Sequence, residues 1–176
     1  SAASDVYKRQ ALGEGAATAQ TSNFKNTVGS LKRLIGRTFQ DPSIQQYEKP
    51  FVNAELVDAK GEVGVKVRFL GEERIFSATQ LLGMYLGKLR DTTQRELGGS
   101  GVSDVVLSVP IWFTDNQRRA MLNAAEIANL NPLRVMNEPT AVALGYGITK
   151  TDLPEPENPR NVISVSYTHL RAHETR

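Results

Sequence analysis

The chain has 176 residues, of which 40% are hydrophobic and 23% charged, and it contains no cysteine. This composition is typical of a globular unit rather than a disordered one, and it excludes disulfides, thiol catalysis and cysteine-based zinc sites. The two ends hold four of the 21 basic and two of the 19 acidic residues, so 17 of each remain in the body. A neutral body predicts no nucleic-acid binding, and no apolar run approaches the roughly 18 residues of a membrane span.

The two ends differ in character from the rest of the chain. Residues 1–10 and 165–176 resemble translated sequencing adapters, so we expect them to be foreign to the fold. Both histidines, His169 and His173, lie in the second segment at a spacing that could present two metal ligands on one helix face. No third ligand accompanies them, so we expect an unstructured tail and no metal site. We also expect no signal peptide, because no charged segment is followed by an apolar one.

The first predicted element is a helix over about 26–35, where apolar residues recur at helical spacing until Gly36 ends the run. A looser stretch with a turn at 41–42 follows. Residues 51–77 then alternate apolar and polar side chains between short turn-rich links. This pattern predicts a three-stranded antiparallel meander.

A long helix comes next. Ser77 and Gln80 have the spacing of a capping box, and the helix is predicted to end near Leu97. The glycine-rich segment 98–101 follows this helix, whereas a phosphate-binding loop opens one. We therefore predict that it is a plain loop.

Alternating strands and helices are predicted for the remainder: a strand at 105–109 ended by Pro110, a helix from Thr114 to about Asn129 with a second capping box at Gln117, a strand at 133–136, and a helix from Pro139 to about Gly147. This alternation is typical of a parallel α/β sheet. Another strand is predicted to begin at 162–163, after a proline-rich extended loop.

The P-loop, dinucleotide-binding and hydrolase motifs are missing from this sequence. The candidate functional residues are instead charged side chains near helix ends. Each also has a reading without function. Lys32 could be an ordinary surface lysine that interacts with the dipole at a helix C-terminus, and Glu138 could be an ordinary carboxylate that stabilises a helix start. Arg118 and Arg119 occupy the first helical turn, which disfavours cations, so we expect a partner elsewhere, by default a tertiary salt bridge, to hold at least one of them.

Taken together, several segments resemble the heat shock protein 70 superfamily in their order and their gaps. These are Asn26-Thr27-Val28 leading into Lys32-Arg33-Leu34-Ile35-Gly36-Arg37, then Val109-Pro110-Ile111-Trp112-Phe113-Thr114, then Asn137-Glu138-Pro139-Thr140. The likeness covers roughly residues 12–163. It implies an α/β, ribonuclease H-like fold, namely part of the first lobe of an actin-like ATPase domain.

The resemblance also implies a division of the chain. The partial nucleotide-binding domain would occupy residues 11–164, between the two adapter-like ends. Residues 40–103, approximately, would form a subdomain of meander and long helix, and 104–164 an α/β subdomain.

Four residues acquire expected roles from this resemblance. Lys32 would reach the γ-phosphate and help orient the attacking water, and Glu138 would position water around the phosphate and magnesium. Pro110 and Arg118 would relay the nucleotide state to a substrate-binding domain. ATP or ADP with Mg²⁺ would serve the full-length parent. The family's phosphate hairpins are expected outside this chain, so we expect no nucleotide binding and no metal site in the chain alone.

Within the superfamily, segments 111–113, 130–137 and 146–154 look more like the heat shock protein 110 branch, with Asp152-Leu153-Pro154 as the best cue. Members of that branch bind ATP and act as nucleotide exchange factors. The implied partners are a heat shock protein 70 chaperone and unfolded polypeptides in the cytoplasm, without nucleic acid or membrane. Two alternatives remain. The first is a conventional heat shock protein 70 ATPase chaperone, because Glu138-Pro139-Thr140 matches the motif of the main family. The second is a truncated chain with no activity of its own.

Overall fold

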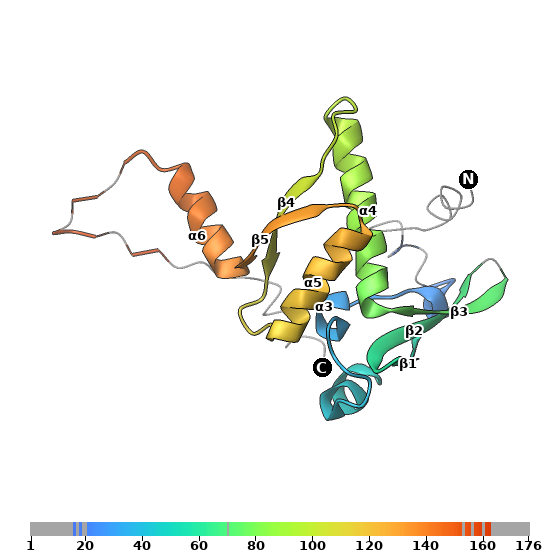
Figure 1. Cartoon of the computed structure of the whole chain (residues 1–176). Coiled ribbons are helices and arrows are strands. Elements are labelled where there is room, and N and C mark those ends of the chain that lie inside the picture. Colours follow the sequence, from blue (N-terminus) through green and yellow to red (C-terminus); the bar gives the residue numbers. More distant parts are fainter. Residues whose placement is uncertain are drawn as a thin grey trace.

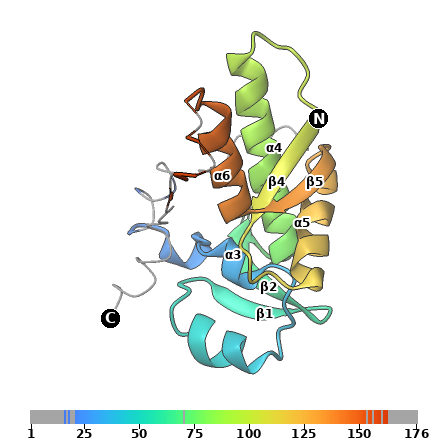
Figure 2. The same ribbon diagram turned by 90° about the vertical axis from the view of Figure 1, so that its left-hand side faces the viewer.

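A computed structural model describes residues 16, 18, 21–69, 71–152, 154–155, 157–159 and 161–162. Both adapter-like ends and the two histidines lie outside these ranges. The described chain contains a three-stranded antiparallel sheet and a parallel strand pair, with helices packed around them (Figure 1). Turned by 90°, the molecule shows the meander at one end, the parallel strands at the other and the short helix α3 between them (Figure 2).

The region predicted as one helix over 26–35 is shorter and broken. A 3-10 turn at Phe24–Asn26 (η1) precedes the four-residue helix α3, Leu31–Leu34. Ser30, between them, has left-handed backbone with φ of 58°, which interrupts a right-handed helix. The predicted length was therefore wrong, although Lys32 does lie on a helix.

A π-helical turn at Ile44–Glu48 (η2) follows, which the sequence pattern did not indicate. Asp41 prepares it, because its carboxylate accepts hydrogen bonds from the N–H of Ser43 at 2.9 Å and the hydroxyl of Ser43 at 2.7 Å. Val52, which lies within the range 51–77 predicted to form the meander, instead closes this turn, donating its N–H to the carbonyl of Glu48 at 3.1 Å.

The predicted meander is present as β1 (Glu55–Ala59), β2 (Glu62–Phe69) and β3 (Glu72–Ser77). A two-residue hairpin joins β1 to β2. Its residues Lys60 and Gly61 both have positive φ, 60° and 92°, which suits the twist of a tight hairpin. Val63 and Val65 of β2 are fully buried and pack with Leu34 of α3 in one hydrophobic cluster.

Both predicted capping boxes are formed. Ser77 and Gln80 cap α4 (Ala78–Glu96), and Thr114 and Gln117 cap α5 (Asp115–Ile127). The two helices pack side by side, and Gly83 of α4 leaves room for Ile127 of α5 (Figure 1).

The parallel pair consists of β4 (Asp104–Val109) and β5 (Asn131–Asn137), connected by α5. β5 starts two residues earlier than the strand predicted at 133–136. Helix α6 (Glu138–Ile148) follows β5 directly, and none of its residues is buried. The strand predicted at 162–163 is not observed at Val162, and Ile163 lies outside the described residues.

Candidate functional site

Lys32 and Glu138 are in direct contact, although 106 positions separate them in the sequence. Lys32 Nζ donates a hydrogen bond to Glu138 Oε1 at 2.5 Å. The two side chains are 58% and 33% exposed, so the pair lies at the surface and remains open to a ligand. An exposed ion pair contributes little to stability, so stability alone does not account for the arrangement.

Lys32 owes its position to the two residues that end its short helix. Leu34 is fully buried in the cluster beneath the meander, and Ile35 is fully buried in a second cluster with Val109 and Phe113. The segment is therefore anchored in two cores at once. Lys32 and the neighbouring Arg33 remain outside both of them.

Glu138 is the first residue of α6, where a carboxylate interacts favourably with the helix dipole. Pro139 follows it in the first turn, as predicted, where its missing N–H costs nothing. Since α6 buries none of its residues, the carboxylate is placed by the end of β5 and by its pairing with Lys32.

Arg118 is held by neutral oxygen atoms rather than by a carboxylate. Its Nε donates to the carbonyl of Phe113 at 3.2 Å, and its Nη2 donates to Asn137 Oδ1 at 2.7 Å. Arg119 pairs instead within its own helix, with Asp115 at 2.8 Å. Among the described residues, neither arginine forms the tertiary salt bridge that was the default expectation, so that expectation was wrong. A partner elsewhere in the chain does hold Arg118, and it is Asn137.

A continuous path connects the four predicted site residues. Pro110 is buried, and its carbonyl accepts the N–H of Phe113 at 3.1 Å. Phe113 in turn accepts from Arg118, which donates to Asn137, the residue immediately before Glu138. Asn137 was missed as a functional residue. The available signal was an asparagine at the predicted start of a helix, next to a candidate carboxylate.

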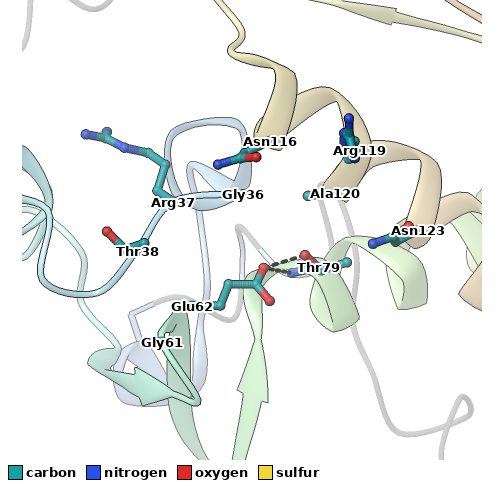
Figure 3. Close-up of a pocket in the computed structure, with 10 residues that line it drawn as sticks. All are labelled: Gly36, Arg37, Thr38, Gly61, Glu62, Thr79, Asn116, Arg119, Ala120 and Asn123. Carbon is teal, nitrogen blue, oxygen red and sulfur yellow. Dashed lines mark hydrogen bonds between the residues drawn. The ribbon is translucent and has the colours of Figure 1, made fainter.

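Two cavities flank the segment that follows α3, and Gly36, Arg37, Thr38 and Asn116 line both. One, of about 310 Å³, extends toward Glu62, Thr79 and Asn123 (Figure 3). There Glu62 points toward Thr79 and accepts its N–H at 3.2 Å and its hydroxyl. The other, of about 420 Å³, extends toward Asp41, Trp112, Thr114 and Gln117. Neither cavity is lined by Lys32 or Glu138.

Gly36, just after α3, lies against the backbone of α5. Its φ is +63°, and a Cβ built on it would lie 2.5 Å from the Cα of Gln117. Glycine is therefore required both by its conformation and by the close approach. Sequence reasoning had recognised Gly36 only as a helix end, because the neighbour it must admit is about 80 positions away in sequence.

Asp41 is the carboxylate among the residues that line the larger cavity. Hydrogen bonds from the Ser43 hydroxyl and N–H, with a further contribution from the Arg37 guanidinium, lower the pKa of Asp41 below its ordinary 3.8. Arg37 Nη2 lies 2.8 Å from Asp41 Oδ2. This cavity therefore has balanced charge at neutral pH.

The described residues contain no group of three or more histidine, cysteine or carboxylate side chains that could hold a metal ion. No helix within the described ranges is both long enough and apolar enough to cross a bilayer.

The mixed α/β fold, with its antiparallel meander and parallel strand pair, is what the resemblance predicted for part of an actin-like ATPase lobe. The family model described as "Hsp70 protein" matches residues 5–167. The chain belongs to the heat shock protein 70 family, and the predicted fold class is confirmed. The matched span includes residues 5–10 and 165–167 of the adapter-like ends, whose origin remains a prediction.

The relatives agree with the expected branch. The chain is 54% identical over 165 residues to "Heat shock protein hsp88" of Neurospora crassa. It is also similar to two heat shock protein homologs of Saccharomyces cerevisiae, with 46% identity over 165 residues to one and 47% over 155 residues to the other. These alignments cover 92%, 92% and 88% of this chain, in that order.

The same alignments cover 23%, 23% and 22% of the relatives, so the chain spans about a quarter of their length. The predicted likeness to the heat shock protein 110 branch is confirmed.

Proposed function

We propose that this chain forms one wall of the ATP site in a heat shock protein 110-type chaperone. The contact between Lys32 and Glu138 is the observation that carries the proposal, because two separate family segments converge there. The family match and the relatives support a nucleotide-binding chaperone. The division into subdomains at residues 40–103 and 104–164 belongs to the same proposal.

The chemistry of the pair fits a phosphate and its water. An ammonium group has three donors, of which Glu138 occupies one, and the second carboxylate oxygen of Glu138 remains available as an acceptor. Magnesium ATP would supply the transferable phosphoryl group. In this proposal Lys32 neutralises charge at the γ-phosphate, and Glu138 accepts a hydrogen bond from the water that Lys32 helps to orient.

Pro110 and Arg118 are proposed to relay the state of this pair to a substrate-binding domain. The path of hydrogen bonds from Pro110 through Phe113 and Arg118 to Asn137, which directly precedes Glu138 in the chain, supports that role. Such a path gives the relay a physical route, and coupling between its ends is the property to be measured.

For the whole parent we propose nucleotide exchange on a heat shock protein 70 partner, with unfolded polypeptides as clients, in the cytoplasm. The likeness to hsp88 and to the two yeast homologs supports this branch over a conventional heat shock protein 70. We propose no nucleic-acid partner.

The test is Lys32→Ala in the full-length parent, with Arg33→Ala as the matched control on the same short helix. Hydrolysis of ATP is expected to fall about tenfold or more with Lys32→Ala, because the charge at the phosphate is lost. Acceleration of nucleotide release from the partner is measured alongside. If nucleotide release from the partner is still accelerated while hydrolysis falls, the nucleotide-exchange role is supported. If both activities are lost, the function of the parent depends on ATP turnover.

Equal hydrolysis rates in the Lys32→Ala and Arg33→Ala proteins would contradict the proposed role of Lys32. For the 176-residue chain itself we propose no measurable ATP affinity, because within the described residues the pair stands on an open surface outside both cavities. A micromolar calorimetric signal with magnesium ATP would overturn that expectation.

A further inference from the structure

Asn137 occupies a helix-capping position without capping the helix. It is the N-cap residue of α6, with extended backbone at φ −73° and ψ 139°, yet its side chain makes no cap hydrogen bond. An asparagine here ordinarily accepts the N–H of the second or third helical residue. The second is Pro139, which has no N–H, so Thr140 offers the only such donor.

The oxygen that could cap α6 is engaged elsewhere. Asn137 Oδ1 accepts a hydrogen bond from Arg118 Nη2 at 2.7 Å. A bond from a charged guanidinium is stronger than one from a neutral backbone N–H, which accounts for the choice of partner. The carboxamide oxygen thus has two possible donors on two different helices, and in this structure it is bonded to Arg118 and not to the first turn of α6.

We propose that Asn137 is a positioning residue whose carboxamide oxygen exchanges between Arg118 and the Thr140 N–H, and so sets Glu138 against Lys32. Glu138 is the first residue of the turn that the exchange would loosen or tighten. The effect on the nucleotide site rests on the proposed function, whereas the exchange of hydrogen-bond partners is independent of it.

The two helices differ in a way that suits this device. Four of the thirteen residues of α5, Ala120, Met121, Ala124 and Ala125, are buried hydrophobics, which fix the helix in the core. Helix α6 buries none of its residues. Arg118 is thus carried by the fixed helix and Asn137 stands at the start of the weakly packed one, so a change in their bond moves α6 rather than α5.

Arg118 is also hydrogen-bonded on the side away from Asn137. Its Nε is bonded to the carbonyl of Phe113, whose N–H is bonded to Pro110. A rearrangement of that turn would withdraw the guanidinium from Asn137 and release the oxygen to cap Thr140.

Amide hydrogen exchange of Thr140, measured by NMR on the 176-residue chain without nucleotide, tests the proposal. In Arg118→Ala the freed oxygen is expected to cap Thr140 and slow its exchange about fivefold, as an N-cap of ordinary strength would. Arg119→Ala is the control and should leave the rate unchanged, because among the described residues this neighbouring arginine is bonded to Asp115 of its own helix. The double variant Arg118→Ala with Asn137→Ala should return the rate to that of the unmodified chain.

A second variant guards against misfolding of the first. Serine in Asn137→Ser caps well but is too short to reach Arg118, so it is expected to slow Thr140 exchange to the same degree. Unchanged or faster exchange in a folded Arg118→Ala or Asn137→Ser chain would overturn the proposal. Because no nucleotide is present, a failure of the proposed ATP site would leave these rates as they are.

Discussion

At the scale of single residues, Asp41 makes the free energy of unfolding depend on pH in the acid range. Its pKa is lowered from 3.8, first by the Ser43 hydroxyl and N–H and then by Arg37. A carboxyl whose folded pKa lies below its unfolded pKa stabilises the fold above about pH 3.8, and this contribution is lost as the pH falls through the folded value. Asp41 therefore matters most at neutral pH.

Asp41→Asn is expected to lower the free energy of unfolding by about 1 kcal/mol at pH 7, because charge-assisted bonds become neutral ones. The difference from the unmodified chain should shrink as the pH is taken below 3.8. Urea unfolding at a series of pH values measures it. Glu72→Gln, which removes an exposed pair with Arg74 within one strand, serves as the control with an effect of at most about 0.5 kcal/mol. An Asp41→Asn deficit that persists unchanged to about pH 2 would refute the assignment.

At Gly36 the cost of a left-handed backbone can be distinguished from the cost of a steric clash, because Gly61 is left-handed without a close neighbour. Gly61→Ala, at φ of +92° with nothing within 4 Å of the new Cβ, should cost only the left-handed penalty of about 1–2 kcal/mol. Gly36→Ala bears that penalty and also places a Cβ 2.5 Å from the Gln117 backbone. We expect it to cost about 2 kcal/mol more than Gly61→Ala in denaturant unfolding. Equal losses would show that the close contact between residue 36 and the backbone of α5 relaxes without cost.

At the scale of elements, the contact between α4 and α5 depends on a missing side chain. A Cβ at Gly83 would lie 2.6 Å from Cγ2 and 2.8 Å from Cβ of Ile127. Alanine at this position would gain helix propensity but force the two helices apart. The helix pair, and with it the placement of Arg118 on α5, is thus set partly by a glycine in the middle of a helix.

Gly83→Ala is accordingly expected to destabilise the chain by about 1–3 kcal/mol. Gly145→Ala in α6 should have the opposite sign, stabilising by up to about 1 kcal/mol, because nothing lies within 4 Å of its Cβ. Thermal unfolding followed by circular dichroism distinguishes the two. Stabilisation by both substitutions would mean that Ile127 moves aside freely.

The elements that the sequence predicted are those with local causes. The capping boxes of α4 and α5 lie within four residues each, and the alternation in β2 is visible without knowledge of its neighbours. The elements that were missed depend on particular bonds. Left-handed Ser30 shortens the first helix, and the bonds from Ser43 to Asp41 prepare η2, which no periodic pattern reveals.

At the scale of the whole molecule, the candidate site was predictable only through family resemblance. Nothing in the surroundings of Lys32 or of Glu138 in the sequence distinguishes them from surface residues, and their 2.5 Å contact requires the folded chain. Asn137 and Gly36 were missed for the same reason. One binds a side chain from α5 and the other admits the backbone of α5, and both partners are distant in the sequence.

Several large apolar side chains of the parallel strands and of α6 are exposed. Val106 of β4 and Leu133 of β5 are 53% and 62% exposed, and Val142, Leu144 and Ile148 of α6 are also more than half exposed. Exposed apolar side chains favour self-association, and we expect the chain to aggregate on heating and to melt below about 50 °C.

Leu133→Thr should reduce self-association, measured by light scattering at increasing concentration, while changing the free energy of unfolding by no more than about 0.5 kcal/mol. The matched control is Leu130→Thr, three positions earlier and only 8% exposed within a hydrophobic cluster. That substitution should cost about 2–4 kcal/mol and increase aggregation, because it removes core packing rather than surface. If Leu133→Thr destabilises the chain as much as Leu130→Thr, Leu133 is not the freely exposed side chain described. A cooperative melt well above about 50 °C in the unmodified chain would show that the exposed apolar surface is tolerated.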